Sequence, residues 1–201
     1  MKRILFSALP IAAIAALTLK PVSDPLPIGA PIPSADVKMK DISGKEVSLG
    51  EAKTNKGLLV MFSCNTCPYV IKNQSRTYEV CKYAMGNGVG VAVLNSNEAK
   101  RGDDDSFNDM KAYAKDQGYQ WYYLVDQNSA LADAFGANRT PECFLFDSEG
   151  KLVYHGAIDD SPADASAVNR KHLTAAMDEM NAGKEVSVKE SKSVGCTIKR
   201  L

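Results

Sequence analysis

The chain has no surplus of either charge, few histidines, and no apolar run long enough to cross a bilayer comfortably. Its 24 basic and 24 acidic residues cancel, which argues against nucleic acid as a partner. The two histidines and the Cys-x-x-Cys lack the second ligand pair of a zinc site, so we expect no metal and no organic cofactor. Without a run of about 20 apolar residues, we expect no stable membrane span.

The N-terminus is typical of a signal peptide, because Lys2-Arg3 precedes an apolar stretch from Ile4 to Leu19. We predict a signal peptide over 1–20, a proline-rich linker over 21–33, and export to the periplasm. An uncleaved signal segment that anchors the chain is the alternative. No cysteine lies near the end of the apolar stretch, which excludes a lipid-modified cysteine as the tether. An exported chain reaches an oxidising compartment, in which disulfides persist.

The main chemical signal is a pair of cysteines, Cys64 and Cys67, with Pro68 directly after them. The pair follows the apolar run Leu58 to Phe62 and precedes a predicted helix, so both thiols lie where a strand leads into a helix. Unpaired backbone N–H groups at a helix N-terminus lower a thiol pKa from about 8.5 toward 3.5–7.5. We therefore expect a reactive thiolate at this position and a disulfide between the two cysteines that can be formed and exchanged.

Hydrophobic periodicity predicts one domain over 34–183, followed by a tail over 184–201 that carries Cys196. The expected strands are 37–39, 46–49, 58–62, 89–94, 121–125, 143–146 and 152–155, and the expected helices are 68–85, 107–117, 129–135 and 168–180. The first two strands form a hairpin. This alternation favours an α/β fold with a mixed central sheet, helices on both faces and an N-terminal hairpin extension.

Several segments resemble the redoxin branch of the thioredoxin superfamily, and more narrowly its bacterial peroxiredoxin-like members with a Cys-Asn-x-Cys-Pro motif. These segments are 62–70, 95–97, Thr140-Pro141 before the strand at 143–146, 150–154, 158–161, and Gly195-Cys196-Thr197-Ile198-Lys199. The resemblance implies a thioredoxin-like fold and thiol redox activity. It also implies that the peptide bond before Pro141 is cis and that Thr140 and Pro141 line the groove for an extended substrate chain.

The sequence departs from this family at two places. Peroxiredoxins have Pro seven residues and Thr or Ser three residues before the peroxidatic cysteine, and neither Cys64 nor Cys67 has that pair. An efficient peroxidase is therefore disfavoured. The link from the strand to Cys64 is also about two residues shorter than in thioredoxins, which leaves open which of the two sulfurs occupies the nucleophile position.

The other three cysteines have different surroundings. Cys81 lies on the helix predicted after Cys67, about 20 Å along it, and Cys143 lies on a predicted core strand. We expect both to pack as small hydrophobic side chains. Cys196 lies in a polar tail where burial is not forced. It is a candidate resolving or structural partner of the dithiol, and a free thiol is the alternative.

Together these features favour an exported thiol-disulfide oxidoreductase that acts through a mixed disulfide, with Cys64 as the attacking thiolate and Cys67 as the resolving thiol. Its partners would be a protein thiol or disulfide substrate and an unidentified redox partner. One alternative is a peroxiredoxin-like peroxide reductase, with peroxide as the substrate and Cys196 as the resolving thiol. Another is a non-catalytic binding or metallochaperone domain.

Overall fold

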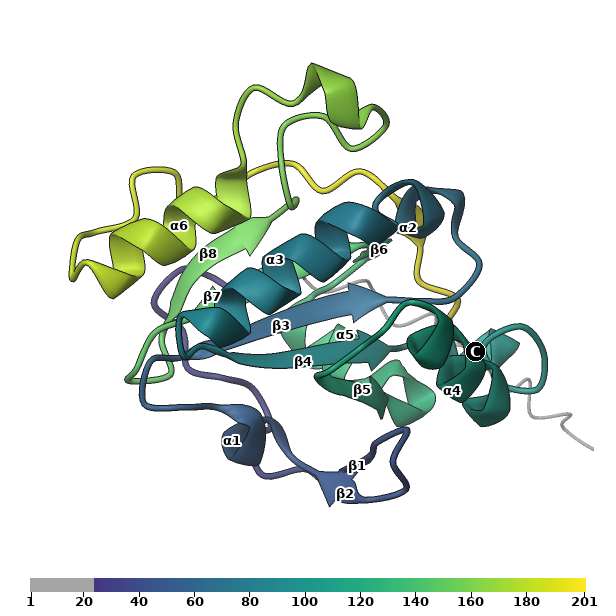
Figure 1. Cartoon of the computed structure of the whole chain (residues 1–201). Coiled ribbons are helices and arrows are strands. Elements are labelled where there is room, and N and C mark those ends of the chain that lie inside the picture. Colours follow the sequence, from purple (N-terminus) through teal and green to yellow (C-terminus); the bar gives the residue numbers. More distant parts are fainter. Residues whose placement is uncertain (1–23) are drawn as a thin grey trace, which may run out of the picture.

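Five strands form the central sheet of the computed structural model, which describes residues 24–201 (Figure 1). They are β3 (Leu58–Ser63), β4 (Gly90–Asn95), β5 (Tyr122–Val125), β7 (Glu142–Phe146) and β8 (Leu152–Gly156), in the order β5-β4-β3-β7-β8. β3 pairs parallel with β4 and antiparallel with β7, so Leu58 lies between Gly90 and Phe146. The predicted mixed sheet is confirmed.

Helices cover both faces of this sheet. Successive side chains of a strand point to opposite faces, so an entirely apolar strand presents apolar side chains to a helical layer on each side. From β3, Leu59 and Met61 pack in one apolar cluster, whereas Leu58, Val60 and Phe62 pack in another. The first cluster includes residues of α3 (Gln74–Gly86), α4 (Phe107–Asp116) and α6 (His172–Asn181), and the second includes residues of α1 (Leu49–Ala52) and α5 (Ala130–Phe135). The sheet thus lies between two helical layers, as in the predicted thioredoxin-like fold.

The helix predicted over 68–85 is divided into α2 (Pro68–Lys72) and α3 at Asn73. Asn73 is buried, and its backbone has φ −102° and ψ 5°, away from helical values. Its side-chain amide donates to the carbonyl oxygens of Tyr69 and Pro162. This side chain therefore ties the end of α2 to the loop after β8.

The N-terminal hairpin consists of β1 (Met39–Lys40) and β2 (Glu46–Val47). Before it, the described part of the proline-rich segment packs on the domain: the N–H of Leu26 donates to the Phe135 carbonyl at 3.0 Å, and the N–H of Gly29 donates to the Leu152 carbonyl at 2.8 Å. The predicted signal peptide over 1–20 lies outside the described residues. Short 3₁₀ turns at 98–100, 127–129 and 165–167 complete the connections.

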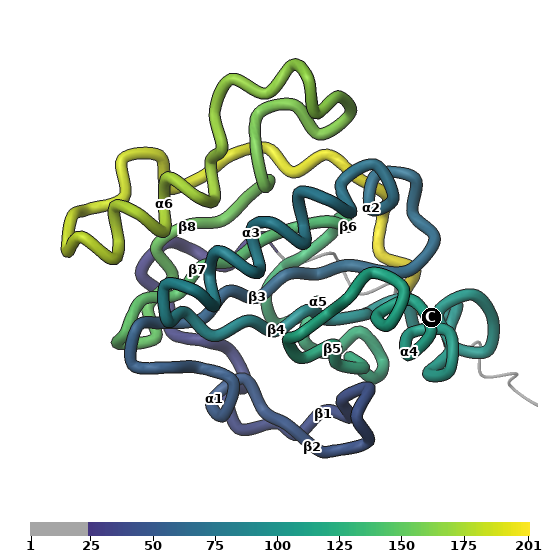
Figure 2. The backbone as a smooth tube through the Cα atoms, viewed as in Figure 1, coloured from purple at the N-terminus to yellow at the C-terminus, as the bar shows by residue number. Residues whose placement is uncertain are grey.

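The tail after α6 crosses the domain to reach α2 (Figure 2). It first runs beside β8, where the backbone N–H of His155 donates to the Lys189 carbonyl and the backbone carbonyl of His155 accepts from the N–H of Ser191. Gly156 permits this approach, because a Cβ there would overlap Ser191, and its φ of 148° also favours glycine. The tail then forms β9 (Cys196–Thr197), which pairs antiparallel with β6 (Arg139–Thr140).

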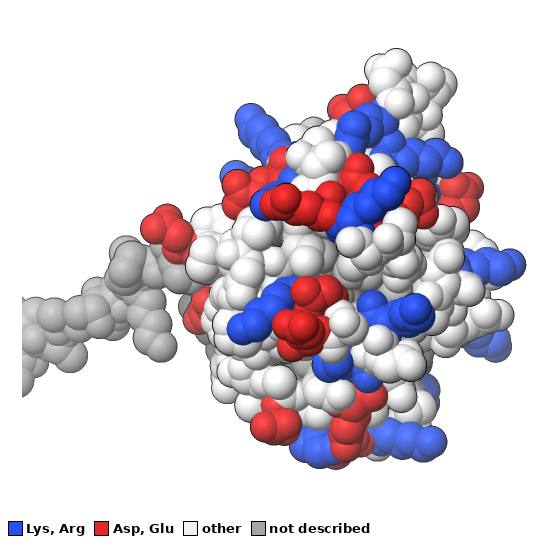
Figure 3. Space-filling model, turned by 90° about the vertical axis from the view of Figure 1, so that its left-hand side faces the viewer, with Lys and Arg blue, Asp and Glu red and all other residues white. Residues whose placement is uncertain are grey.

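Charged side chains of both signs are mixed on the face shown in Figure 3, without a broad area of one sign. This mixture agrees with the formal net charge of zero. Within residues 24–201, we find no helix with the length and apolar content that a membrane crossing requires.

Candidate functional site

Three of the five cysteines meet beyond the end of β3. Cys67 and Cys196 form a disulfide, with their Cα atoms 6.0 Å apart. Cys64 is a free, buried thiol in the same small apolar cluster, together with Val70. The sequence separation of the bonded pair is 129 residues, so the fold, and not a local turn, brings Cys196 to the Cys-x-x-Cys motif.

Thr140 contacts both cysteines of the motif. Its hydroxyl oxygen lies 3.5 Å from the Cys64 sulfur, and its carbonyl oxygen lies 3.4 Å from the Cys67 sulfur. The peptide bond from Thr140 to Pro141 is cis, as the resemblance implied. The substrate-groove residues predicted from the sequence therefore lie directly against the cysteine pair.

Cys64 is 1% exposed, and burial raises its pKa above the ordinary value. The negative charge of Asp105 raises this pKa further, whereas the Thr140 hydroxyl and the backbone N–H groups of Thr66 and Cys67 lower it. Burial is the largest of these effects. The prediction of a lowered pKa at Cys64 is therefore wrong for this arrangement, because the thiol is withdrawn from water.

The cysteine at the helix N-terminus is Cys67, which is the N-cap of α2 and is followed by Pro68 at the first helical position. Cys64 lies three residues earlier, just after the last residue of β3. The sequence pattern had suggested that the dithiol as a whole occupies the strand-to-helix junction. In the structure residues 64–67 fill this junction, as predicted. Cys67 is the N-cap and is bonded to the tail, whereas the Cys64 sulfur interacts with the backbone N–H groups of Thr66 and Cys67 just before the helix.

A buried carboxylate, Glu142, holds the segment that leads to Thr140. One of its oxygens accepts from the backbone N–H groups of Asn138 and Arg139, at 2.7 and 2.9 Å. The other lies 2.7 Å from Nε2 of His155 on the neighbouring strand. Glu142 is 4% exposed. Sequence reasoning missed this residue, because a single Glu at the start of an apolar strand has no spacing signal.

A second buried carboxylate, Asp105, supports the other side of the cysteine loop. It accepts from the backbone N–H of Asn65 at 2.8 Å and from the side-chain amides of Asn95 and Asn97, at 2.7 and 2.8 Å. Asp105 has 0% exposure. The acidic run 103–105 has the composition of a solvated helix start, but Asp105 is buried because the Asn-rich loop provides donors for its carboxylate.

The remaining cysteines lie away from this site. Cys81 is on α3 and Cys143 is on β7, and both are fully buried in the apolar cluster beneath α3 and α6. Burial raises the pKa of each thiol. Both therefore pack as small hydrophobic residues, as predicted. Within residues 24–201 there is no group of three or more Cys, His, Asp or Glu side chains placed to hold a metal ion.

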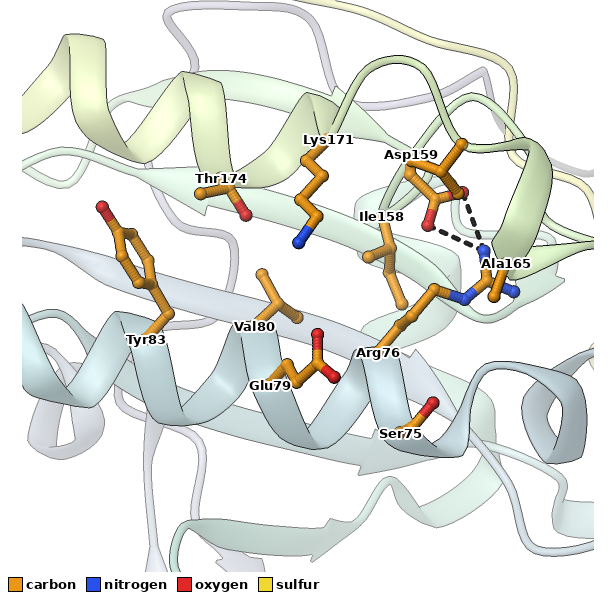
Figure 4. A pocket seen from close by; sticks show the side chains of 11 residues that line it. Ser75, Arg76, Glu79, Val80, Tyr83, Ile158, Asp159, Ala165, Lys171 and Thr174 are labelled. Carbon is orange, nitrogen blue, oxygen red and sulfur yellow. Dashed lines mark hydrogen bonds and ion pairs between the residues drawn. The ribbon is translucent and has the colours of Figure 1, made fainter.

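A cavity of about 500 Å³ lies between α3 and the segment that leads into α6 (Figure 4). At its edge one terminal nitrogen of Arg76, Nη1, donates to both carboxylate oxygens of Asp159, at 2.7 and 2.9 Å, and the guanidinium also donates to the carbonyl oxygens of Ser161 and Pro162. No cysteine lines this cavity. The contacts of Arg76 hold the loop after β8 against α3.

Most of the domain matches a known protein family. The sequence model of the Redoxin family matches residues 27–171. A thiol-disulfide oxidoreductase of Bacillus subtilis (strain 168), ResA, is 27% identical over 118 residues, which are 57% of this chain and 60% of that protein. The chain thus matches less than two thirds of the length of this relative.

Solved structures agree with the fold. A hypothetical protein from Sinorhizobium meliloti 1021 is 34% identical, with a TM-score of 0.80 over 89% of this chain and 97% of that chain. The thioredoxin domain of a thiol-disulfide oxidoreductase from Bacteroides vulgatus is 20% identical, with a TM-score of 0.55 over 69% of this chain and 93% of that one, and supports the fold alone. The resemblance to thioredoxin-fold redoxins is confirmed.

Proposed function

The chain belongs to the Redoxin family, and we propose that it is an exported thiol-disulfide oxidoreductase in which Cys67 forms the mixed disulfide with the substrate. One observation carries this proposal. Cys67 is joined to Cys196 while the free thiol of Cys64 lies in the same cluster, against the same residue, Thr140. A sulfur that has one bonded partner and a second thiol beside it has the arrangement that thiol-disulfide exchange requires.

The assignment of roles differs from the sequence-based expectation, in which Cys64 attacks and Cys67 resolves. Cys64 is 1% exposed and Cys67, with the tail bonded to it, is 5% exposed. Burial raises the pKa of Cys64, which disfavours its attack on a foreign disulfide. Cys67 bonds to a residue of a distant segment that approaches from outside the Cys-x-x-Cys loop. We therefore assign attack on the substrate to Cys67 and resolution to Cys64.

The proposed half-reaction, in which a substrate dithiol is oxidised, begins with Cys67 bonded to Cys196. The Cys64 thiolate attacks the Cys67 sulfur, so the bond to Cys196 breaks as the Cys64–Cys67 bond forms, and Cys196 leaves as a thiolate that takes up the proton lost by Cys64. A substrate thiolate then attacks Cys67 and releases Cys64. A second substrate thiol attacks the substrate sulfur of this mixed disulfide, so the substrate loses two electrons and the Cys64/Cys67 pair gains them. Run in reverse, the same steps reduce a substrate disulfide.

The similarity to ResA, a protein named as a thiol-disulfide oxidoreductase, supports the same reaction class for this chain. The test is the reduction of insulin disulfides with dithiothreitol as the reductant. We expect activity in the unmodified protein, none in Cys67→Ser, and slowed turnover in Cys64→Ser/Cys196→Ser, because its mixed disulfide lacks both thiols that can bond to Cys67. Cys81→Ala, which removes a buried thiol of the core, serves as the control. Full activity in Cys67→Ser would remove that sulfur from the mechanism.

Export is the second part of the proposal. It is supported by Lys2-Arg3 and the apolar stretch that follows them. The test is expression of the full chain in a Gram-negative host, with separation of the periplasmic fraction and mass measurement of the protein. We expect a periplasmic product that lacks about 20 N-terminal residues. Full-length protein confined to the cytoplasmic fraction would contradict export, and full-length protein in the membrane fraction would favour the anchor.

Peroxide reduction remains the rival activity, because a disulfide between Cys67 and Cys196 also matches a peroxidatic and a resolving thiol. The residue three positions before Cys67 is Cys64, not the Thr or Ser of the peroxidases that the sequence resembles. We therefore expect reduced protein to consume hydrogen peroxide no faster than free cysteine does in stopped-flow measurements. Consumption a thousandfold faster, lost in Cys67→Ser, would replace the proposal with a peroxidase.

A further inference from the structure

The C-terminal tail lies in the groove where a substrate chain would bind. Cys196 is bonded to Cys67, and it pairs with Thr140 in the short antiparallel ladder of β6 and β9. A substrate held in a mixed disulfide with Cys67 would form the same bond. An extended substrate chain would also gain affinity from backbone pairing with an exposed strand edge. The tail thus has both features of a bound substrate.

The residue before Cys196 fits this groove only because it lacks a side chain. A Cβ on Gly195 would overlap the carbonyl oxygen of Thr140 and would lie 3.3 Å from the nitrogen of Pro141. Both are backbone atoms, and they cannot move aside as the end of a flexible side chain can. A chain that pairs with Thr140 in this register therefore requires glycine directly before its cysteine.

The residue two positions after Cys196 is held by apolar contacts. Ile198 is 3% exposed and belongs to the cluster that contains Phe62 and Phe135. Its backbone N–H donates to the Asn138 carbonyl at 3.1 Å. Burial of an aliphatic side chain of this size strengthens binding about ten- to a hundredfold. The groove therefore selects a large aliphatic side chain at this position.

Beyond Ile198 the tail is held in the groove by polar contacts. The N–H of Lys199 donates to Asn97 at 2.8 Å, and its carbonyl accepts from the N–H of Ala99 at 2.9 Å. The Arg200 guanidinium donates to the Ala137 carbonyl at 2.7 Å. The last residue, Leu201, is 90% exposed. Specific contacts thus extend from Gly195 to Arg200 and end there.

We propose that the segment 195–200 is a built-in copy of the substrate, and that the groove takes extended polypeptides with glycine before the reacting cysteine and a large aliphatic residue two positions after it. This inference rests on the proposed function. The tail must leave before such a substrate enters. The attack of Cys64 on Cys67 releases it, because the bond to Cys196 breaks in that step.

The test uses the full chain with Cys64→Ser and Cys196→Ser, so that Cys67 is the only thiol left at the site. The probe is a peptide of residues 193–201 whose cysteine carries thionitrobenzoate through a disulfide. The Cys67 thiolate attacks the peptide sulfur and forms the mixed disulfide, and thionitrobenzoate leaves as a coloured anion. Three further peptides carry Gly195→Ala, Ile198→Ala or, as the matched control, Leu201→Ala.

We expect the first two substitutions to slow capture about tenfold or more, and Leu201→Ala to change it less than about twofold. In the protein, adding Ile198→Ala weakens the hold of its own tail and should speed capture of the unmodified peptide. Equal rates for all four peptides would overturn the substrate copy while leaving the thiol exchange of Cys67 intact. If Cys67 also fails to react with dithionitrobenzoate alone, the proposed function itself fails, and this inference with it.

Discussion

The hydroxyl of Thr140 lies 3.5 Å from the sulfur of Cys64, inside a pocket that is otherwise mainly apolar. A hydrogen bond to a thiolate lowers its pKa, and this contact opposes the effect of burial on Cys64. We expect Thr140→Val, which keeps the shape and removes the hydroxyl, to slow iodoacetamide alkylation of Cys64 about tenfold at pH 8, because a hydrogen bond to a charged group is worth about 1.5 kcal/mol or more.

The measurement is peptide mapping by mass spectrometry on protein with the Cys67–Cys196 bond intact, so that Cys64 is the only free thiol at the site. Thr140→Ser retains the hydroxyl and serves as the control, with a rate close to that of the unmodified protein. A rate in Thr140→Val equal to that in Thr140→Ser would show that the hydroxyl does not stabilise the thiolate.

The raised pKa of Cys64 predicts a pH dependence. Its thiol stays protonated at pH values where a free cysteine, with a pKa of about 8.5, has ionised. The alkylation rate should therefore keep rising above pH 9, where that of free cysteine levels off. The unfolded chain loses this proton at a lower pH than the folded chain, so the stability contribution is present below about pH 8.5 and is lost as pH rises further. A plateau at or below pH 8 would contradict the burial effect.

Asp105 is expected to stabilise the fold through its three buried hydrogen bonds. In Asp105→Asn, a side-chain N–H₂ replaces one accepting oxygen and faces a donor. An unpaired buried donor costs about 1–3 kcal/mol. Urea unfolding should show a loss of this size in Asp105→Asn, whereas the matched change at the exposed neighbour Asp104 should stay within about 0.5 kcal/mol. Equal stabilities for the two variants would mean that the buried network contributes nothing.

Replacement of Glu142 should lower the stability of the fold more than replacement of Asp105 does. Its removal leaves the N–H groups of Asn138 and Arg139 without their acceptor and His155 without its partner. We expect Glu142→Ala to lower the free energy of unfolding by about 3 kcal/mol or more, and Glu149→Ala, at an exposed turn position, to lower it by less than about 0.5 kcal/mol. Calorimetry of both variants checks this. A loss under 1 kcal/mol in Glu142→Ala would refute its supporting role.

The central strands were predictable because each is a continuous apolar run between turn residues. β3 is such a run, and so is β4. Most helices were predictable from their apolar periodicity and from the Gly or Asn residues that follow them. β6 and β9 have only two residues each and no periodicity. They exist because the fold brings Thr140 and Cys196 together, and a chain must be folded before such a contact can be recognised.

The cysteine pair, the Thr140-Pro141 segment and Cys196 as a candidate partner of the dithiol were also found from the sequence, but not which of the two sulfurs Cys196 bonds to. Sequence spacing favoured a bond between Cys64 and Cys67, whereas the bond present joins Cys67 to Cys196. The thiol pKa depends on burial and on Asp105, which comes from a different loop. Local sequence patterns carry neither kind of information, because both depend on contacts between distant segments.

The role of Cys67 is tested most directly by finding which sulfur bonds to a substrate. Two variants of the full chain leave one thiol each at the site: Cys64→Ser/Cys196→Ser keeps Cys67, and Cys67→Ser/Cys196→Ser keeps Cys64. Each is incubated with a peptide disulfide and examined by non-reducing mass spectrometry. We predict a peptide adduct at Cys67 in the first variant and almost none in the second. An adduct that forms at Cys64 and not at Cys67 would contradict this prediction.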